Sequence, residues 1–295
     1  MFPGYNTNGF AHHRLDDALR ILADLGYEGV ALTLDVHHLD PFAPDFPASL
    51  ARTRALLDRL GLRTVVETGA RFLLDPYRKH QPTLLSAAPE GRARRLDFLT
   101  RAADAAHALG SDALSFWSGA PDDDAPTDVL LDRLADGCHR LLDHAAALGG
   151  RGVRLAFEPE PGMFIDSLAR FETLLARVNN PLFGLTIDVG HLHCLGELPI
   201  ADHIRRWAGR LANVHIEDMR RGVHDHLMFG EGEIAFEPVL TALAGSGYAS
   251  GVYVELSRHS HDAVTAARRS LAFLRAAWPT WPPEPPPDEQ RPPRG

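Results

Sequence analysis

Four residues with metal-binding side chains each follow a short apolar run of a predicted strand. The runs are LAF, LTI, NV and VYV, and the residues are Glu158, Asp188, His215 and Glu255. A buried carboxylate or imidazole is costly unless it is paired, protonated or bound to a metal. Three carboxylates close together repel one another unless a cation lies among them. This set of three oxygen ligands and one nitrogen ligand predicts one divalent ion, for which Mn²⁺, Mg²⁺, Co²⁺ and Zn²⁺ are all suitable.

Short apolar runs alternate along the chain with longer amphipathic segments that often end in glycine, the usual helix stop. The predicted strands span 4–10, 29–35, 62–69, 112–119, 153–160, 183–191, 211–219 and 251–259. Eight strands alternating with helices predict an α/β fold of the (β/α)8 TIM-barrel type. The alternative, an open doubly wound sheet, would have a glycine-rich phosphate loop after an early strand, and the sequence has none there.

In such a barrel the chemistry lies at the carboxyl ends of the strands, where the four residues are predicted to meet. We expect one barrel domain over residues 1–278 and a disordered tail over 279–295, where 8 of 17 residues are proline.

The composition excludes several classes of protein. The chain has 295 residues, a formal net charge of −9 and only two cysteines. The acidic balance argues against a nucleic-acid partner, and two cysteines cannot form a disulfide scaffold. We see neither a leader pattern nor an apolar stretch of about 20 residues, so we expect a cytoplasmic protein without a membrane partner.

Five motifs, in the order FEPEPG, TIDVGH, NVHIED, HDHLMFGEGEI and YVEL, resemble the xylose-isomerase-like barrel superfamily. That group includes sugar phosphate isomerases and epimerases, ketose 3-epimerases, inosose isomerases and dehydratases, and endonuclease IV. The resemblance implies that the four residues above are the metal ligands, and that His191 and Arg221 bind substrate oxygens. One departure is Phe164, where the ketose epimerases carry a second glutamate; Glu160 is a candidate to replace it.

The sequence and this resemblance together predict a metal-dependent isomerase or epimerase. Its substrate would be a sugar or cyclitol-like α-hydroxy ketone, converted through an enediolate. Glu158 and Glu255 come from strands separated around the ring and could act as the catalytic proton carriers. Two alternatives stay open: a metal-dependent lyase or dehydratase acting on an inosose, dehydroshikimate or keto-sugar, and a multi-zinc phosphodiesterase of the endonuclease IV type.

Further side chains are expected to contact the substrate, namely His224, His226, Glu67 and Trp117. Trp117 could form an apolar wall against a sugar ring or simply pack in the barrel. For His224 and His226 an alternative is a second metal ion, because the endonuclease IV branch binds additional zinc with a comparable Asp-x-His pair. This chain has His-x-His instead.

The predicted loop over residues 69–95 is long for a barrel connection, and long loops in compact domains are usually functional. It carries Arg71, Arg78, Lys79 and His80. One interpretation is a lid whose cations bind a phosphate or carboxylate of the substrate; the alternative is a solvated surface or a dimer contact. Relatives are commonly dimers or tetramers, which makes a homo-oligomer an open expectation.

Overall fold

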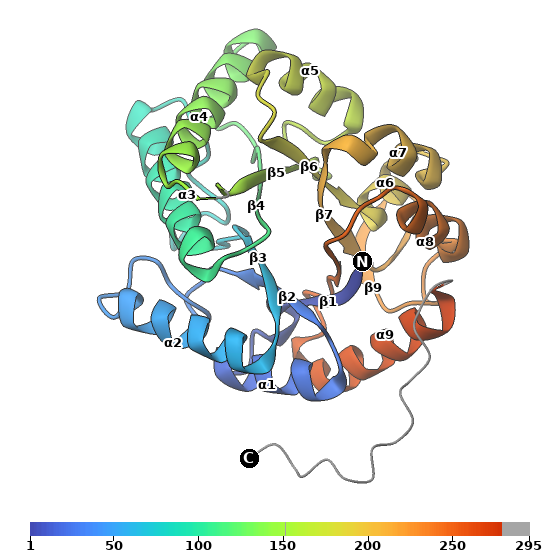
Figure 1. Ribbon diagram of the computed structural model, residues 1–295. Helices are drawn as coiled ribbons and strands as arrows, with labels where there is room; N and C mark the ends of the chain where they lie inside the picture. The colour runs from blue at the N-terminus through green and yellow to red at the C-terminus, as the bar shows by residue number, and fades with distance from the viewer. Residues whose placement is uncertain (151, 279–295) are drawn as a thin grey trace.

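Eight of the apolar runs form parallel strands, and these strands close into a barrel. The computed structural model describes residues 1–150 and 152–278, and Figure 1 shows the strands at its centre. The barrel strands are β1 (Phe2–Asn6), β2 (Gly29–Thr33), β3 (Arg63–Glu67), β4 (Ala113–Trp117), β5 (Arg154–Glu158), β6 (Phe183–Asp188), β7 (Leu211–Ile216) and β10 (Gly251–Val254). Their order around the ring is β1-β10-β7-β6-β5-β4-β3-β2, which confirms the predicted (β/α)8 barrel.

The amphipathic segments form the helices that surround this barrel in Figure 1. They are α1 (Leu15–Leu25), α2 (Phe46–Leu60), α3 (Pro89–Leu109), α4 (Thr127–Ala147), α5 (Leu168–Val178), α6 (Val189–Leu195), α7 (Ile200–Trp207), α8 (Phe236–Gly245) and α9 (Ala263–Ala277). Helix α1 shows the principle, because its leucine face is buried and it ends where Gly26 adopts a φ of 101°.

The barrel interior is filled near the amino ends of the strands by a small apolar cluster that includes Phe2, Val65 and Tyr253. Gly4 and Gly251 lie beside the Tyr253 ring, which occupies the space that a Cβ atom would need at either glycine. Higher in the barrel, the hydroxyls of Ser115 and Thr186 lie 2.9 Å apart. The interior therefore becomes polar toward the carboxyl ends of the strands, where the site lies.

Three segments differ most from the predicted strand pattern. The strand predicted over 4–10 begins earlier, at Phe2, and ends at Asn6, because the Asn6 side chain accepts a hydrogen bond from the Asn8 N–H and begins a 3₁₀ helix over Thr7–Phe10. The strand predicted over 183–191 ends at Asp188, because that side chain accepts a hydrogen bond from the His191 N–H and begins α6. The segment after β7 is an antiparallel hairpin of β8 (Asp218–Arg220) and β9 (Val223–Leu227), where a loop was predicted. The Asp218 carboxylate fixes this hairpin by accepting hydrogen bonds from three backbone N–H groups, those of Met219, Gly230 and Ile234.

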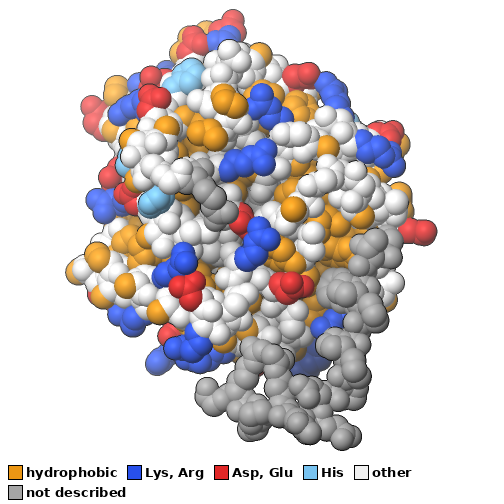
Figure 2. Space-filling view, in the orientation of Figure 1, with side chains coloured by type: hydrophobic (Ala, Val, Ile, Leu, Met, Phe, Trp, Pro, Cys, Tyr) orange, Lys and Arg blue, Asp and Glu red, His pale blue; other side chains and the backbone are white. Residues whose placement is uncertain are grey.

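Charged side chains of both signs are interspersed on the face of the molecule in view in Figure 2. Several exposed ion pairs of the protein join residues of one helix, such as Arg54 and Asp58 of α2. Across the described residues, none of the helices is both long and apolar enough to cross a membrane. The predicted proline-rich tail over 279–295 lies outside the described residues, and the expected single domain over 1–278 stays a prediction.

Candidate metal and substrate site

A cavity of about 300 Å³ opens at the carboxyl ends of the barrel strands. Residues from strands all around the ring line it, as do residues of the loops that follow those strands. Three of the four predicted metal-binding side chains line this cavity directly, namely Glu158, His215 and Glu255. Asp188 lies beside them, because its carboxylate belongs to the same group of neighbouring ligand atoms.

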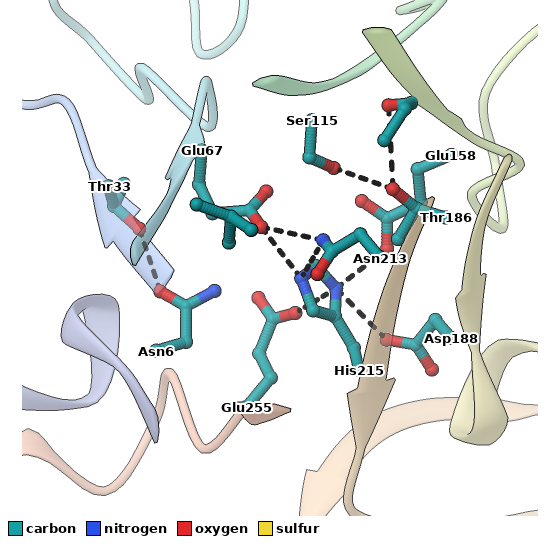
Figure 3. Close-up of polar contacts among 12 residues, drawn as sticks. Asn6, Thr33, Glu67, Ser115, Glu158, Thr186, Asp188, Asn213, His215 and Glu255 are labelled. Carbon is teal, nitrogen blue, oxygen red and sulfur yellow. Dashed lines mark hydrogen bonds and ion pairs between the residues drawn. The ribbon is translucent and has the colours of Figure 1, made fainter. Parts of the chain in front are cut away.

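The three carboxylates of this set converge on one nitrogen of the fourth residue, His215 (Figure 3). The His215 Nδ1 atom lies 2.9 Å from Glu255 Oε2, 3.1 Å from Glu158 Oε1 and 3.8 Å from Asp188 Oδ2. One ligand atom from each residue falls within 4.8 Å of the others. Three carboxylates and one imidazole thus surround a single point.

Strand register explains the convergence. Glu158 is the last residue of β5, Asp188 is the last residue of β6, and Glu255 follows β10 directly. Asp188 pairs across the sheet with His215 of β7, and Tyr253 of β10 pairs with the same histidine. Parallel strands in this register end at one level, so their terminal side chains meet over the barrel mouth.

A second layer of polar contacts lies behind the imidazole. Glu67 Oε1 lies 2.9 Å from the His215 Nε2 atom and accepts a hydrogen bond of 2.9 Å from Asn213 Nδ2. Glu67 was predicted to contact substrate. It does line the cavity, but its Oε1 atom contacts His215 and Asn213, which gives it the geometry of a positioning residue.

The electrostatics of the site show how strongly it attracts positive charge. Burial raises the pKa of Glu158 well above its ordinary value. Burial also disfavours the charged form of Glu255, but the interaction with His215 outweighs it and lowers the pKa of that carboxyl. Burial opposes the charge on His215 too, yet Glu67 and Glu158 hold its pKa well above the usual range. Without an ion, a proton on the imidazole therefore offsets the carboxylate charge.

A divalent cation fits this group of residues. The donor set of three carboxylates and one imidazole suits Mn²⁺, Mg²⁺, Co²⁺ and Zn²⁺. The Asp188 Oδ2 atom is buried and has no hydrogen-bond partner among the described residues, so a ligand oxygen is available there. A hydrogen bond from Nε2–H to Glu67 would leave the lone pair of Nδ1 free for the ion.

Comparison with known proteins places this chain in a family. The family model described as xylose isomerase-like TIM barrel matches residues 19–277. The chain belongs to this family. The inosose dehydratase of Lacticaseibacillus casei is 30% identical over 152 residues, 45% of this chain. The matched segment covers 50% of that relative, so this chain spans about half of the relative's length.

Two further similarities extend over most of this xylose isomerase-like chain. The L-ribulose-5-phosphate 3-epimerase UlaE of Salmonella paratyphi C is 26% identical over 243 residues, which cover 81% of each chain. A solved structure of IolI protein with a binding zinc atom superposes with a TM-score of 0.74 at 17% identity, covering 94% of this chain and 98% of that one. At that identity the structural likeness shows the fold alone.

Three predicted histidines gather on one side of the cavity of this xylose isomerase-like barrel. His191 lies on α6, and His224 and His226 lie on β9. The Nε2 atoms of His191 and His224 are 3.0 Å apart, and the ring centroids of His224 and His226 are 5.2 Å apart. Burial lowers the pKa of His191 to about 4, so its ring is neutral at neutral pH and can accept a hydrogen bond or bind a metal.

Trp117 also lines the cavity, at the end of β4. The Arg95 guanidinium lies over its ring, 5.1 Å from the centroid. The His80 ring meets it edge to face, 5.0 Å away. Trp117 is thus held in place from the loop side while part of its surface faces the cavity.

Arg221 does not line the cavity, and the expectation that it contacts substrate stays a prediction. Arg220 and Val223 pair across the β8–β9 hairpin, which puts Arg221 and Gly222 in its two-residue turn. The exposed Arg221 side chain lies against Gly196 at the end of α6, and its backbone N–H donates to Glu233. Two other arginines do line the cavity, Arg71 in the loop after β3 and Arg258 after β10.

Three further residues lie at or beside the site, although the sequence alone pointed to them weakly or not at all. Asn8 Nδ2 donates a 2.7 Å hydrogen bond to Glu255 Oε1 and so orients that carboxylate. Glu160 lines the cavity, and burial raises its pKa to about 7. Glu217 is fully buried two residues after His215. In the sequence, Glu217 could have been found as a charged residue that directly follows the apolar end of β7.

Proposed function

We propose that this chain is a metal-dependent isomerase or epimerase that acts on a sugar or cyclitol-like α-hydroxy ketone. The observation that carries the proposal is the convergence of Glu158, Asp188, His215 and Glu255 on one point in the cavity. Similarity to an L-ribulose-5-phosphate 3-epimerase over 81% of the chain supports the sugar class. The ion would be Mn²⁺, Mg²⁺, Co²⁺ or Zn²⁺, and the solved structure of IolI protein with a binding zinc atom, which shares this fold, supports a divalent metal.

The divalent ion, when bound, would polarise the substrate carbonyl and stabilise negative charge on the adjacent oxygens. Glu158 and Glu255 contact His215 Nδ1 from β5 and from the end of β10, so the two carboxylates approach the cavity from different strands. One of them would take the proton from the carbon next to the carbonyl, giving an enediolate of the substrate. The other would return a proton to the opposite face, which inverts that carbon.

Other side chains would hold the substrate in place. His191 and His224 line the cavity, and their ring nitrogens can bind substrate hydroxyls. Trp117 would offer an apolar face to the sugar ring, and Arg71 and Lys79 also line the cavity. A phosphate or carboxylate on the substrate would pair with these two cations.

Proton exchange in heavy water tests this proposal. The purified, metal-loaded chain is incubated in D₂O with a panel of ketoses, ketose phosphates and inososes, and deuterium at the α-carbon is followed by NMR. We expect exchange with at least one substrate and a loss of about 10²-fold or more in Glu158→Gln and in Glu255→Gln. Glu172→Gln, at an exposed site on α5, is the matched control. Full activity in both cavity variants would overturn the proposal.

A dehydratase is the second candidate, and the 30% identity with inosose dehydratase supports it. The first step is the same removal of an α-proton, but a C–O bond at the neighbouring carbon then breaks and water leaves. Mass spectrometry of the product separates the two reactions, because an isomerase keeps the substrate mass and a dehydratase gives a product lighter by one water.

A further inference from the structure

The β8–β9 hairpin contributes to the wall of the cavity, although it lies outside the barrel sheet. In the described part of the chain its two strands pair with each other and form a separate two-stranded sheet. A lone hairpin is marginally stable in water. Strand β9 nevertheless carries two histidines that line the cavity, His224 and His226, so contacts outside the hairpin must hold these side chains in place.

The hairpin is anchored through its backbone at its base and at its turn. At the base, the Asp218 carboxylate accepts hydrogen bonds from three backbone N–H groups. At the turn, the Gly222 N–H donates a 2.9 Å hydrogen bond to the Cys194 carbonyl in the last turn of α6. None of these contacts involves residues 224–226, so the part of β9 that carries the two histidines needs a contact of its own.

Arg258 supplies that contact from the connection between β10 and α9, where it also lines the cavity. Its Nη1 atom forms an ion pair with Oδ1 of Asp225, the residue between the two histidines. Its Nη2 atom donates a 3.3 Å hydrogen bond to the His224 carbonyl. One guanidinium therefore binds both a side chain and the backbone of β9. Since β10 pairs with β7 and the hairpin follows β7, this contact joins two neighbouring parts of the cavity wall.

The position of Asp225 determines what the contact can control. Asp225 is covalently linked to both histidines, so a shift of the backbone there moves both imidazoles. The His224 Nε2 atom lies 3.0 Å from the Nε2 atom of His191, a distance that such a shift would change. The Arg258 and Asp225 side chains are 62% and 34% exposed, and an ion pair of that exposure adds little to the stability of a fold. Its loss should thus alter the cavity far more than the fold.

We propose that Arg258 is a positioning residue of the cavity. Through Asp225 and the His224 carbonyl it sets His224 and His226 where a substrate would contact them. The proposal rests on the proposed function for the presence of a substrate, whereas the positioning itself can be measured on the free protein.

Hydrogen exchange and NMR of the histidine rings test the proposal without a substrate. In Arg258→Gln we expect the amides of residues 218–227 to exchange about tenfold faster than in the wild type. We also expect the ring resonances of His224, assigned with His224→Gln, to shift. The free energy of unfolding in urea should change no more than in the control. Arg205→Gln, which removes an exposed ion pair with Asp202 on α7, is the matched control.

A double-mutant cycle tests whether Arg258 acts through Asp225. Asp225→Asn should also speed exchange in residues 218–227, and the double variant should exchange no faster than Arg258→Gln, because both substitutions break one contact. Additive effects would overturn the proposal. So would wild-type exchange and wild-type His224 resonances in Arg258→Gln. Faster exchange throughout the chain, with a matching loss of stability, would overturn it too, since Arg258 would then serve the fold alone.

Kinetics with a substrate found by α-proton exchange extend the test. Arg258→Gln should raise the KM about tenfold and leave kcat within about twofold, because none of the four converging side chains is changed. An unchanged KM would contradict the positioning role. If no substrate exchanges its α-proton, only the proposed isomerase fails, since hydrogen exchange and NMR still decide the role of Arg258.

Discussion

The Nε2 atom of His215 lies 2.9 Å from Oε1 of Glu67, on the side of the ring opposite the three carboxylates that face Nδ1. With an ion bound at Nδ1, a carboxylate at that place would accept the Nε2–H hydrogen bond and so favour the tautomer with a lone pair on Nδ1. The Asn213 side-chain amide donates a hydrogen bond to the same Glu67 oxygen and so fixes the position of that carboxylate. Glu67, at the end of β3, thus sets the orientation of the His215 ring from the opposite side of the barrel.

Glu67→Gln should weaken metal binding without removing a ligand. The amide keeps the shape of the side chain but loses the charge that favours Nε2–H, so we expect an affinity about 10- to 100-fold lower. Competition with a chelating dye measures it. Glu28→Gln, an exposed site before β2, is the control. An unchanged affinity in Glu67→Gln would show that the contact with His215 does not tune the site.

Arg71 and Lys79 line the cavity, whereas Arg78 between them pairs with Asp75. We expect Arg71→Ala with Lys79→Ala to raise the KM for a phosphorylated ketose about tenfold, which corresponds to about 1.4 kcal/mol. The KM for the same ketose without phosphate should change little. Steady-state kinetics on both substrates measures this, and Arg78→Ala is the control. Equal effects on the two substrates would contradict a role in anion binding.

Arg95 anchors the loop that runs from the end of β3 to α3. Its buried guanidinium donates to the backbone carbonyls of Pro82 and His80, at 2.8 and 2.6 Å. Arg95→Gln would leave acceptors unpaired, so we expect the free energy of unfolding to fall by about 2 kcal/mol. Urea unfolding measures it, with the exposed Arg94→Gln as the control. A loss as small as that of the control would show that the loop is held by other contacts.

His80 should make stability depend on pH. Burial, with Lys79 adding to it, lowers the pKa of His80 to about 4. In the unfolded chain its pKa is about 6.5, so between these values the unfolded state binds more protons. Stability should therefore be highest above pH 6.5 and fall as the pH decreases toward 4, by at most about 1.4 kcal/mol per pH unit from this residue.

Urea unfolding of His80→Gln at pH 7.5 and pH 5 checks this expectation. The variant should lose less stability than the wild type between the two pH values, and His12→Gln at an exposed site should behave like the wild type. The same loss in His80→Gln as in the wild type would assign the pH dependence to other groups.

The sequence was sufficient to predict the barrel and the four converging side chains, because short apolar runs ending in Glu, Asp or His indicate both the strand and its carboxyl end. It was not sufficient for Arg221 or Glu217. The position of Arg221 depends on a hairpin whose partner strand, β9, carries the polar residues His224, Asp225 and His226 and so lacks the apolar pattern of a buried strand. The direction of Glu217 depends on its packing against Gly190, a contact between helix α6 and the connection from β7 to β8.

The hydrogen bond from Asn8 to Glu255 joins residues 247 positions apart, close to the two ends of the described chain. Contacts of such high sequence separation carry a large loop-closure entropy and form late in folding. Since β1 pairs with β10 beside this contact, the cavity is complete only once the last strand has joined the first. An ion that requires the assembled ring would bind the native state and not the unfolded chain, so metal concentration should set the apparent folding equilibrium.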